Sequence, residues 1–182
     1  GFFDLGGGNL VPFNSYTPFE YDLSSPNLFA YKMEFSDITR RPIFHYFLMA
    51  SSGNEDGSIS GSGIAEISGN DLMVTMGGWG LTLDTQVATN VTYNYQASTI
   101  FHELGHNLGL YHGGDEEVNF KPNHLSSMNY LYQLAGLSTI GNNEGDRYYE
   151  RFYPGNASCD IAPNTNSHLG STDDFIIDYS NG

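Results

Sequence analysis

The clearest periodic pattern in the chain runs over residues 95–110. Its apolar residues Ile100, Leu104 and Leu108 recur every four positions, the spacing that places side chains on one face of an α-helix. Gly109 follows where such a helix would end, because glycine readily adopts the left-handed conformation that terminates helices. The pattern therefore predicts a helix over residues 95–110.

Shorter apolar runs predict the elements that precede this helix. Residues 42–50 (PIFHYFLMA) form an apolar run that predicts a strand buried on both faces. Residues 63–67 and 71–76 predict two further strands. Residues 27–36 have the spacing of a short helix, for which three polar residues are candidate N-caps: Ser24, Ser25 and Asn27.

Composition and charge narrow the class of protein. The chain has 182 residues, enough for one domain with a buried core. Its net charge is −15, from 21 acidic and 6 basic residues. Such a surface repels phosphate backbones and anionic lipids, so no nucleic-acid or membrane partner is expected. The chain has no run of about 18 apolar residues, so no membrane-spanning helix is expected.

Three features of the sequence bear on the cellular location of the protein. The single cysteine, Cys159, excludes an intrachain disulfide and a cysteine-rich zinc module. Gly1 is not an initiator methionine, which indicates a processed or excised chain. Two glycosylation sequons, at Asn90 and Asn156, fit secretion. We therefore expect a secreted, extracellular protein.

The segment HELGHNLGLYH, residues 102–112, has the pattern of a metal site. His102 and His106 are four residues apart, so both imidazoles project from one face of the predicted helix, at a separation that suits two bonds to one Zn²⁺. Glu103 lies about 100° further round the helix. There it flanks the place where a water molecule would bind, which is the position of a general base.

A third histidine can join this site only if the helix stops. His112 lies six residues past His106 and would face away from the metal on a continued helix. Gly109 stands between them and permits a sharp reversal of the chain. Three histidine ligands leave one position open for water, as in catalytic zinc sites. The alternative is a helix whose histidines only pack or face solvent.

The pattern HExxHxxGxxH resembles the signature of the metzincin zinc endopeptidases. The segment SSMNY, residues 126–130, resembles the Met-turn of that family, with Met128 as an apolar floor beneath the metal. Tyr130 resembles the tyrosine that astacin-like and serralysin-like members place near the metal, where it would bind zinc or donate to an oxyanion. The alternative for both residues is ordinary packing in the core.

The resemblance implies an α+β, metzincin-like zincin fold in one catalytic domain, residues 1–182. A mixed sheet and the active-site helix would form an upper lobe over about residues 1–109. An irregular lower lobe over about residues 110–182 would carry the third histidine and the Met-turn. The resemblance also implies an edge strand that binds an extended substrate. We assign this strand to Gly63, Ile64 and Ala65.

The function that the resemblance implies is that of a secreted zinc endopeptidase acting on extended polypeptides, with protein or peptide substrates as partners. Glu103 would take a proton from water and pass it to the leaving amine. The alternative is a zinc-binding, metzincin-like module that binds proteins with little or no catalysis. The presence of Glu103 argues against this alternative, because a binding module has no need of that carboxylate. The sequence does not indicate the oligomeric state.

Other features separate the chain from particular zincins. A thermolysin-like enzyme takes its third ligand from a later glutamate, yet residues 120–132 contain none. Gly113, after the third histidine, does not match the marker residue of astacins, matrixins or the snake-venom type, so the subfamily stays open. No long backing helix is evident in residues 1–94 and no C-terminal helix in residues 131–182. Either these elements are cryptic or the chain is a trimmed fragment of a longer enzyme.

Calcium is a second candidate ion. Three loops offer clustered oxygen ligands, at residues 54–56, 115–117 and 142–146. A solvated acidic surface explains the same pattern equally well.

Overall fold

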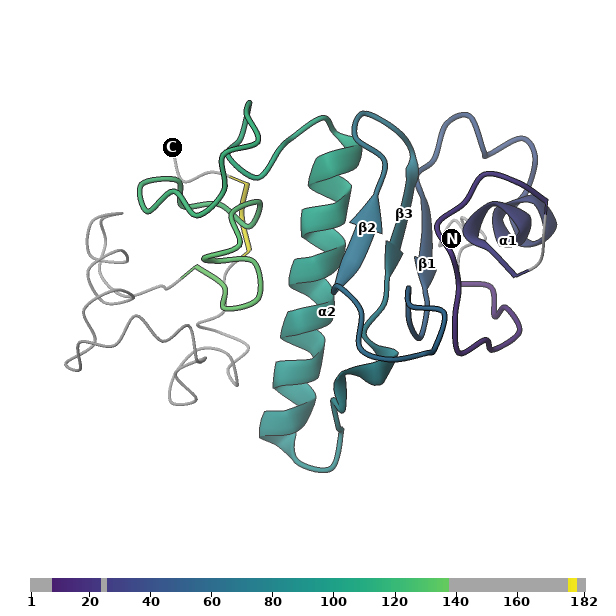
Figure 1. Ribbon diagram of the computed structural model, residues 1–182, viewed down its shortest axis with the longest axis horizontal. Helices are drawn as coiled ribbons and strands as arrows, with labels where there is room; N and C mark the ends of the chain where they lie inside the picture. The colour runs from purple at the N-terminus through teal and green to yellow at the C-terminus, as the bar shows by residue number, and fades with distance from the viewer. Residues whose placement is uncertain (1–7, 24–25, 138–176, 180–182) are drawn as a thin grey trace, which may run out of the picture.

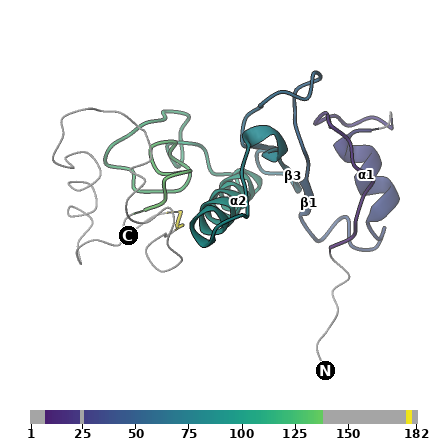
Figure 2. The same ribbon diagram turned by 90° about the horizontal axis from the view of Figure 1, so that it is seen from below.

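A small sheet lies between two helices in the part of the chain that the structure describes. The structure, a computed structural model, describes residues 8–23, 26–137 and 177–179. In chain order, its elements are α1 (Leu28–Phe35), β1 (Tyr46–Met49), β2 (Gly63–Ala65), β3 (Asp71–Val74), the 3₁₀ turn η1 (Gly77–Trp79) and α2 (Gln86–Asn107). Figures 1 and 2 show α1 and α2 on opposite sides of the sheet, and the segment that follows α2 on the far side of that helix.

The sheet is mixed, with the strand order β1-β3-β2. β1 runs parallel to β3, whereas β2 pairs with β3 in the antiparallel direction. Met73 of β3 lies opposite both Leu48 of β1 and Ile64 of β2. α2 packs against β2 and β3. The mixed sheet beside the helix that carries the histidine motif confirms the predicted α+β class.

The core beneath α1 combines apolar packing with a buried ion pair. Its fully buried apolar residues are Leu28, Tyr31, Leu48 and Met73. Beside them, Lys32 of α1 donates to Asp71 of β3 across 2.5 Å, with both side chains almost wholly buried. Removing one partner of such a pair would leave an uncompensated buried charge, at a cost of about 3–5 kcal/mol. The pair therefore fixes α1 against the middle strand of the sheet.

The prediction that residues 42–50 are buried on both faces was wrong. The strand occupies only Tyr46–Met49, and Phe47 and Met49 are 38% and 46% exposed. β1 is an edge strand, and α2 packs against β2 and β3 instead. The face of β1 that carries Phe47 and Met49 is therefore left partly open to solvent, while Leu48 on the other face is covered by α1.

The short helix predicted over residues 27–36 is confirmed as α1 (Leu28–Phe35). Of the three candidate caps, Asn27 is the residue used: its side-chain oxygen accepts from the N–H of Ala30 at 2.7 Å. The helix ends at Ser36, whose hydroxyl and backbone N–H both donate to the carbonyl of Lys32. The Asn27 side chain thus satisfies a backbone N–H at the start of the helix, and the Lys32 carbonyl accepts two hydrogen bonds at its end. Helix ends leave such backbone groups without a partner inside the helix.

The long helix begins nine residues earlier than predicted, at Gln86 rather than Tyr95. The side chain of Thr85 caps it by accepting from the N–H of Ala88 at 3.1 Å. Its first turns project beyond the sheet, and Val87 and Tyr93 are exposed. No apolar stripe marks this part of the helix, because there is nothing for such a stripe to pack against.

The remaining predictions are met in part. β2 and β3 form where strands were predicted over residues 63–67 and 71–76, but each is shorter. After α2 the described chain consists of turns around a small apolar cluster made by Leu125, Tyr132 and Leu137.

No helix within the described ranges is long and apolar enough to cross a membrane. Cys159, the sequon at Asn156 and the loop at residues 142–146 lie outside the described residues.

Candidate metal centre

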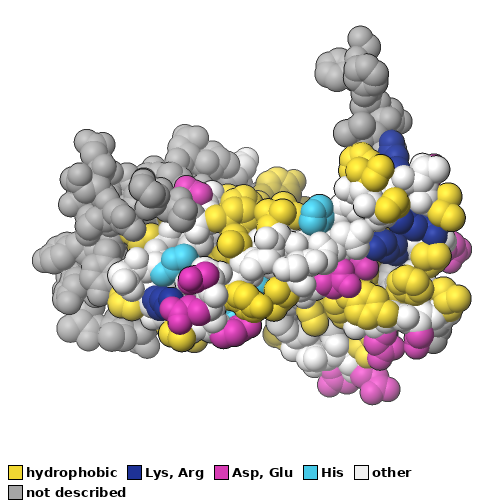
Figure 3. Space-filling view, turned by 90° about the horizontal axis from the view of Figure 1, so that it is seen from above, with side chains coloured by type: hydrophobic (Ala, Val, Ile, Leu, Met, Phe, Trp, Pro, Cys, Tyr) yellow, Lys and Arg dark blue, Asp and Glu magenta, His cyan; other side chains and the backbone are white. Residues whose placement is uncertain are grey.

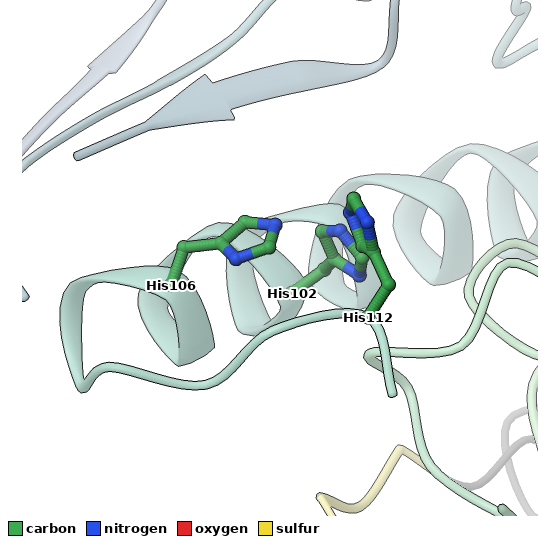
Figure 4. Close-up of side chains that lie close together, drawn as sticks. All are labelled: His102, His106 and His112. Atoms are coloured by element: carbon green, nitrogen blue, oxygen red, sulfur yellow. The ribbon is translucent and has the colours of Figure 1, made fainter. Parts of the chain in front are cut away.

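Three histidines converge at the end of α2 nearest the sheet. His102 and His106 project from α2, and their ring centroids lie 4.8 Å apart. His112 comes from the loop after the helix and lies 5.3 Å from His102 and 4.9 Å from His106. One ligand atom from each ring lies within 4.8 Å of the others. Figure 4 shows the three rings turned toward one shared space.

The chain reversal that brings His112 into this group takes place at Gly109, as predicted. Gly109 has φ +91°, in the left-handed region. Its N–H donates to the carbonyl of His106 at 2.9 Å, and the N–H of Leu110 donates to the carbonyl of Gly105 at 2.9 Å. These two bonds form a Schellman motif, which ends a helix and turns the chain back.

A second turn holds His112 in place. Tyr111 and Gly114 exchange two backbone hydrogen bonds, from Tyr111 N–H to Gly114 O at 2.8 Å and from Gly114 N–H to Tyr111 O at 3.0 Å. His112 sits inside this tight turn, and Gly114 has φ +94°. The third imidazole is therefore presented by a closed loop directly after the helix.

Hydrogen bonds to Nδ1 fix how two of the rings are oriented. Nδ1 of His102 lies 2.8 Å from the carbonyl oxygen of Ser127, and Nδ1 of His106 lies 2.8 Å from that of Leu110. A carbonyl only accepts, so each Nδ1 carries the proton and each Nε2 keeps a free lone pair. Nδ1 of His112 lies 3.9 Å from the Glu117 carboxylate. Outer partners of this kind orient metal-binding histidines.

Burial keeps these imidazoles neutral. It lowers the pKa of His102 to about 3 and also lowers the pKa values of His106 and His112. Neutral imidazole is the form that binds metal ions. Three neutral rings that face one space, with two of the lone pairs fixed by the backbone, fit a divalent metal ion. The predicted histidine triad is thus positioned to bind a metal.

Glu103 lies beside the triad in a buried position on α2. Burial raises the pKa of its carboxyl group to about 8. The side chain packs against β2 at Gly63, where a β-carbon would come within 2.7 Å of Oε1 and 2.8 Å of Cγ. The absence of a side chain at Gly63 therefore makes the room that Glu103 occupies.

Two residues of the segment 126–130 lie beside the histidines. Met128 is fully buried, and its Sδ packs so closely against Gly105, between the two ligand histidines of α2, that a β-carbon there would overlap it. Tyr130 is 44% exposed, and its ring centroid lies 4.4 Å from that of His112. The structure thus brings both residues of the predicted Met-turn segment to the histidines; what they do there is a proposal taken up below.

The predicted substrate strand is found as β2, at the edge of the sheet beside α2. Ile64 is half-exposed, and Gly63 and Ala65 are partly buried. Gly63 of this strand lies against the side chain of Glu103. The binding of a peptide to it remains a prediction.

Asn107 anchors the end of the helix that carries the histidines, and sequence reasoning missed it. Its buried side chain donates to the carbonyls of Glu66 at 2.8 Å and Asp71 at 2.9 Å. Its Oδ1 lies 2.9 Å from Nδ1 of His45. These contacts tie the last turn of α2 to both ends of the β2–β3 connection. The sequence feature that could have identified Asn107 is its polar side chain near the end of a helix, directly after His106.

The calcium prediction gains no support from the described residues. Among them, the three histidines form the only group of three or more His, Cys, Asp or Glu side chains whose ligand atoms converge. The acidic loops at residues 54–56 and 115–117 do not form such a group, and the loop at residues 142–146 lies outside the described chain. Calcium binding stays a prediction.

Comparison with known proteins agrees with this geometry. Residues 32–113 match a family model described as metallo-peptidase family M12B, reprolysin-like. The match begins in α1 and ends just past His112, so it covers the whole sheet, α2 and the three histidines. The resemblance to metzincin metallopeptidases and the metzincin-like fold are thereby confirmed. No curated protein and no solved structure matches the chain.

Proposed function

Because residues 32–113 match a reprolysin-like metallopeptidase, we propose that the protein is a zinc-dependent endopeptidase that cleaves extended polypeptides. The observation that carries this proposal is the convergence of three neutral imidazoles beside the buried carboxyl group of Glu103. Three nitrogen ligands that leave a position for water are the arrangement of catalytic zinc sites.

His102, His106 and His112 would hold the zinc ion. When bound, zinc lowers the pKa of water and polarises a carbonyl group. The backbone carbonyls of Ser127 and Leu110 keep two of the rings in the tautomer that binds metal. Met128, which is buried and packs against Gly105 between these two histidines, would form the apolar floor of a Met-turn.

Glu103 is the proposed general base. Its carboxylate accepts the proton of the attacking water, and the resulting acid donates that proton to the amine that leaves. Burial raises the pKa of this group to about 8. A carboxyl group whose pKa lies near the working pH both accepts and releases a proton readily.

Tyr130 is placed to assist as a hydrogen-bond donor. Its ring stands next to His112 and is partly exposed. Burial, with the charges of Glu103 and Glu117, raises the pKa of its hydroxyl, which therefore keeps its proton at neutral pH. A neutral phenol donates to the oxyanion that forms during peptide hydrolysis.

The peptide substrate would lie along β2. This strand is one of the two edges of the described sheet, and its Gly63 lies against Glu103. An extended peptide that pairs with this edge brings its backbone carbonyls past the base. Secretion belongs to the same proposal, since the acidic composition and the sequons fit an extracellular peptidase; secretion of a tagged precursor from its own host tests it.

The test compares wild type with Glu103→Gln, which keeps the shape of the side chain and removes the base. Wild type loaded with zinc should cleave unfolded casein and lose this activity in a chelator. Glu103→Gln should bind zinc as wild type does and cleave at least about 1,000-fold more slowly. The matched control is Glu55→Gln, in an exposed loop, which should be fully active. Zinc binding by wild type with no cleavage of any peptide would favour the binding module instead.

A further inference from the structure

Phe120 has an unusual backbone conformation for its residue type. Its φ is +57°, and only one other non-glycine residue of the described chain, Ser68, has a positive φ. The left-handed region crowds the β-carbon of any side chain, and for a bulky residue it is a genuine outlier. Such strain persists only where the surrounding structure imposes it, and it gathers at functional sites.

The neighbouring Asn119 imposes this conformation. Its side-chain oxygen accepts from the N–H of Phe120 at 2.7 Å and from the N–H of Tyr130 at 3.0 Å. One side chain therefore clamps the strained residue to the tyrosine that stands next to His112. The clamp sets where the Phe120 ring lies relative to the metal centre.

The Phe120 ring stays about half-exposed in this arrangement. Phe120 is 54% exposed, although burial is the usual way in which an aromatic ring stabilises a fold. Among the described residues, its ring contacts that of Tyr130, edge to face, at a centroid distance of 5.8 Å. Tyr130 in turn lies 4.4 Å from His112. Figure 3 shows exposed hydrophobic side chains lying among acidic ones on one face of the molecule.

We propose that Phe120 is a specificity-determining residue: its ring, with that of Tyr130, forms an aromatic wall beside the metal centre that binds an apolar or aromatic side chain of the peptide substrate. This inference rests on the proposed endopeptidase function. Both rings come from the segment after the histidines, and the Tyr130 ring contacts that of His112, so a side chain of a peptide that passes the metal centre would meet this wall. Glu117, close to His112, disfavours an acidic side chain there.

The first test measures cleavage preference. A peptide library varied around the scissile bond should show that wild type prefers Phe or Leu over Ala at one position. Phe120→Gly should reduce kcat/KM for the Phe and Leu peptides about tenfold, the effect of one lost aromatic contact. It should reduce kcat/KM for the Ala peptide much less, because the alanine side chain is too short to gain from the wall. Phe120→Asn is the second variant, because asparagine also tolerates a positive φ.

The second test measures stability of the metal-free protein, and Phe13→Gly is its matched control. Phe13 is also exposed, at 85%, but has no positive φ, and it lies far along the chain from the histidines, at the rim of a small cavity that Tyr31 and Leu48 also line. Phe120→Gly relieves strain, so its urea midpoint should equal or exceed that of wild type. Phe13→Gly should lower the midpoint, because glycine there relieves no strain and only increases the conformational entropy of the unfolded chain.

The outcomes are distinct. If Phe120→Gly lowers the urea midpoint as much as Phe13→Gly does and leaves the cleavage preference unchanged, Phe120 is a packing residue and the inference is wrong. If wild type cleaves peptides without preference for apolar residues at any position, the inference is again wrong while the proposed function stands. If zinc-loaded wild type cleaves nothing, the proposed function fails and this inference fails with it.

Discussion

Gly63 of β2 and Glu103 of α2 approach so closely that a side chain at position 63 would occupy the place of the Glu103 carboxyl group. A β-carbon on Gly63 would lie 2.7 Å from Oε1 and 2.8 Å from Cγ of Glu103. The edge strand can therefore lie this close to the proposed base only because residue 63 has no side chain.

Gly63→Ala should therefore displace the Glu103 carboxyl group and reduce peptidase activity about 10- to 100-fold, because a small misplacement of a catalytic group is costly. Zinc content should stay that of wild type, since the three histidines do not contact Gly63. Gly61→Ala is the control: a β-carbon there would meet only ordinary contact, 3.7 Å from the carbonyl of Gly63. Full activity in Gly63→Ala would contradict the prediction.

A β-carbon at Gly63 would also lie 2.8 Å from the carbonyl of Met73, so strain in the sheet must be separated from contact with Glu103. To separate the two effects, the loss of unfolding free energy caused by Gly63→Ala is measured twice, once with Glu103 present and once in the Glu103→Ala variant. The cost of Gly63→Ala should be smaller when Glu103 is replaced. Equal costs would mean that the strand alone is disturbed.

Gly109→Ala should weaken both the fold and the metal site. Gly109 has φ +91°, and a β-carbon would lie 3.0 Å from Ser68 Oγ. Left-handed alanine costs about 1–2 kcal/mol, and any relaxation moves Leu110, which orients His106, and the loop that carries His112. Gly80→Ala, with φ +68° and open space around it, should lose similar stability but keep wild-type zinc affinity in a competition titration. Equal zinc affinity in both variants would contradict this role of Gly109.

Asn107→Ala should cost about 1–3 kcal/mol of unfolding free energy, because the carbonyl of Glu66 loses the Asn107 donor and the carbonyl of Asp71 keeps only the N–H of Glu66. Urea denaturation of the metal-free protein measures this. Asn90→Ala, on an earlier turn of α2, should change stability by less than about 0.5 kcal/mol. Comparable losses in the two variants would show that Asn107 does not anchor the helix.

Glu66 should make the fold sensitive to acid. Partial burial would raise the pKa of its carboxyl group, but the N–H groups of Asn70 and Asp71 and the Tyr21 hydroxyl outweigh burial and hold the pKa below its ordinary value of 4.5. A lowered pKa stabilises the fold above 4.5, and this stabilisation is lost as pH falls through the folded value. Wild type should thus exceed Glu66→Gln in stability at pH 7 and approach it below pH 4.5. A stability difference that is constant between pH 7 and pH 3 would contradict this.

The sequence was sufficient to predict the features that depend on local spacing. His102 and His106 share a helix face because they are four residues apart, and Gly109 marks the reversal that His112 requires. What depends on tertiary packing was not predictable. Phe47 and Met49 are exposed because α2 covers the other strands, and α2 starts at Gln86 through a cap with no apolar stripe behind it. The contact of the Ser127 carbonyl with His102, and the contacts of Asn107 with Glu66 and Asp71, arise only in the folded chain.

The central claim is that His102, His106 and His112 together bind one zinc ion. X-ray absorption at the zinc edge, on protein loaded with one equivalent of zinc at neutral pH, tests it most directly. We expect three imidazole nitrogens at about 2.0–2.1 Å, and two after His112→Ala. A spectrum that is the same for wild type and His112→Ala, or one with a sulfur ligand at about 2.3 Å from Cys159, would contradict the account.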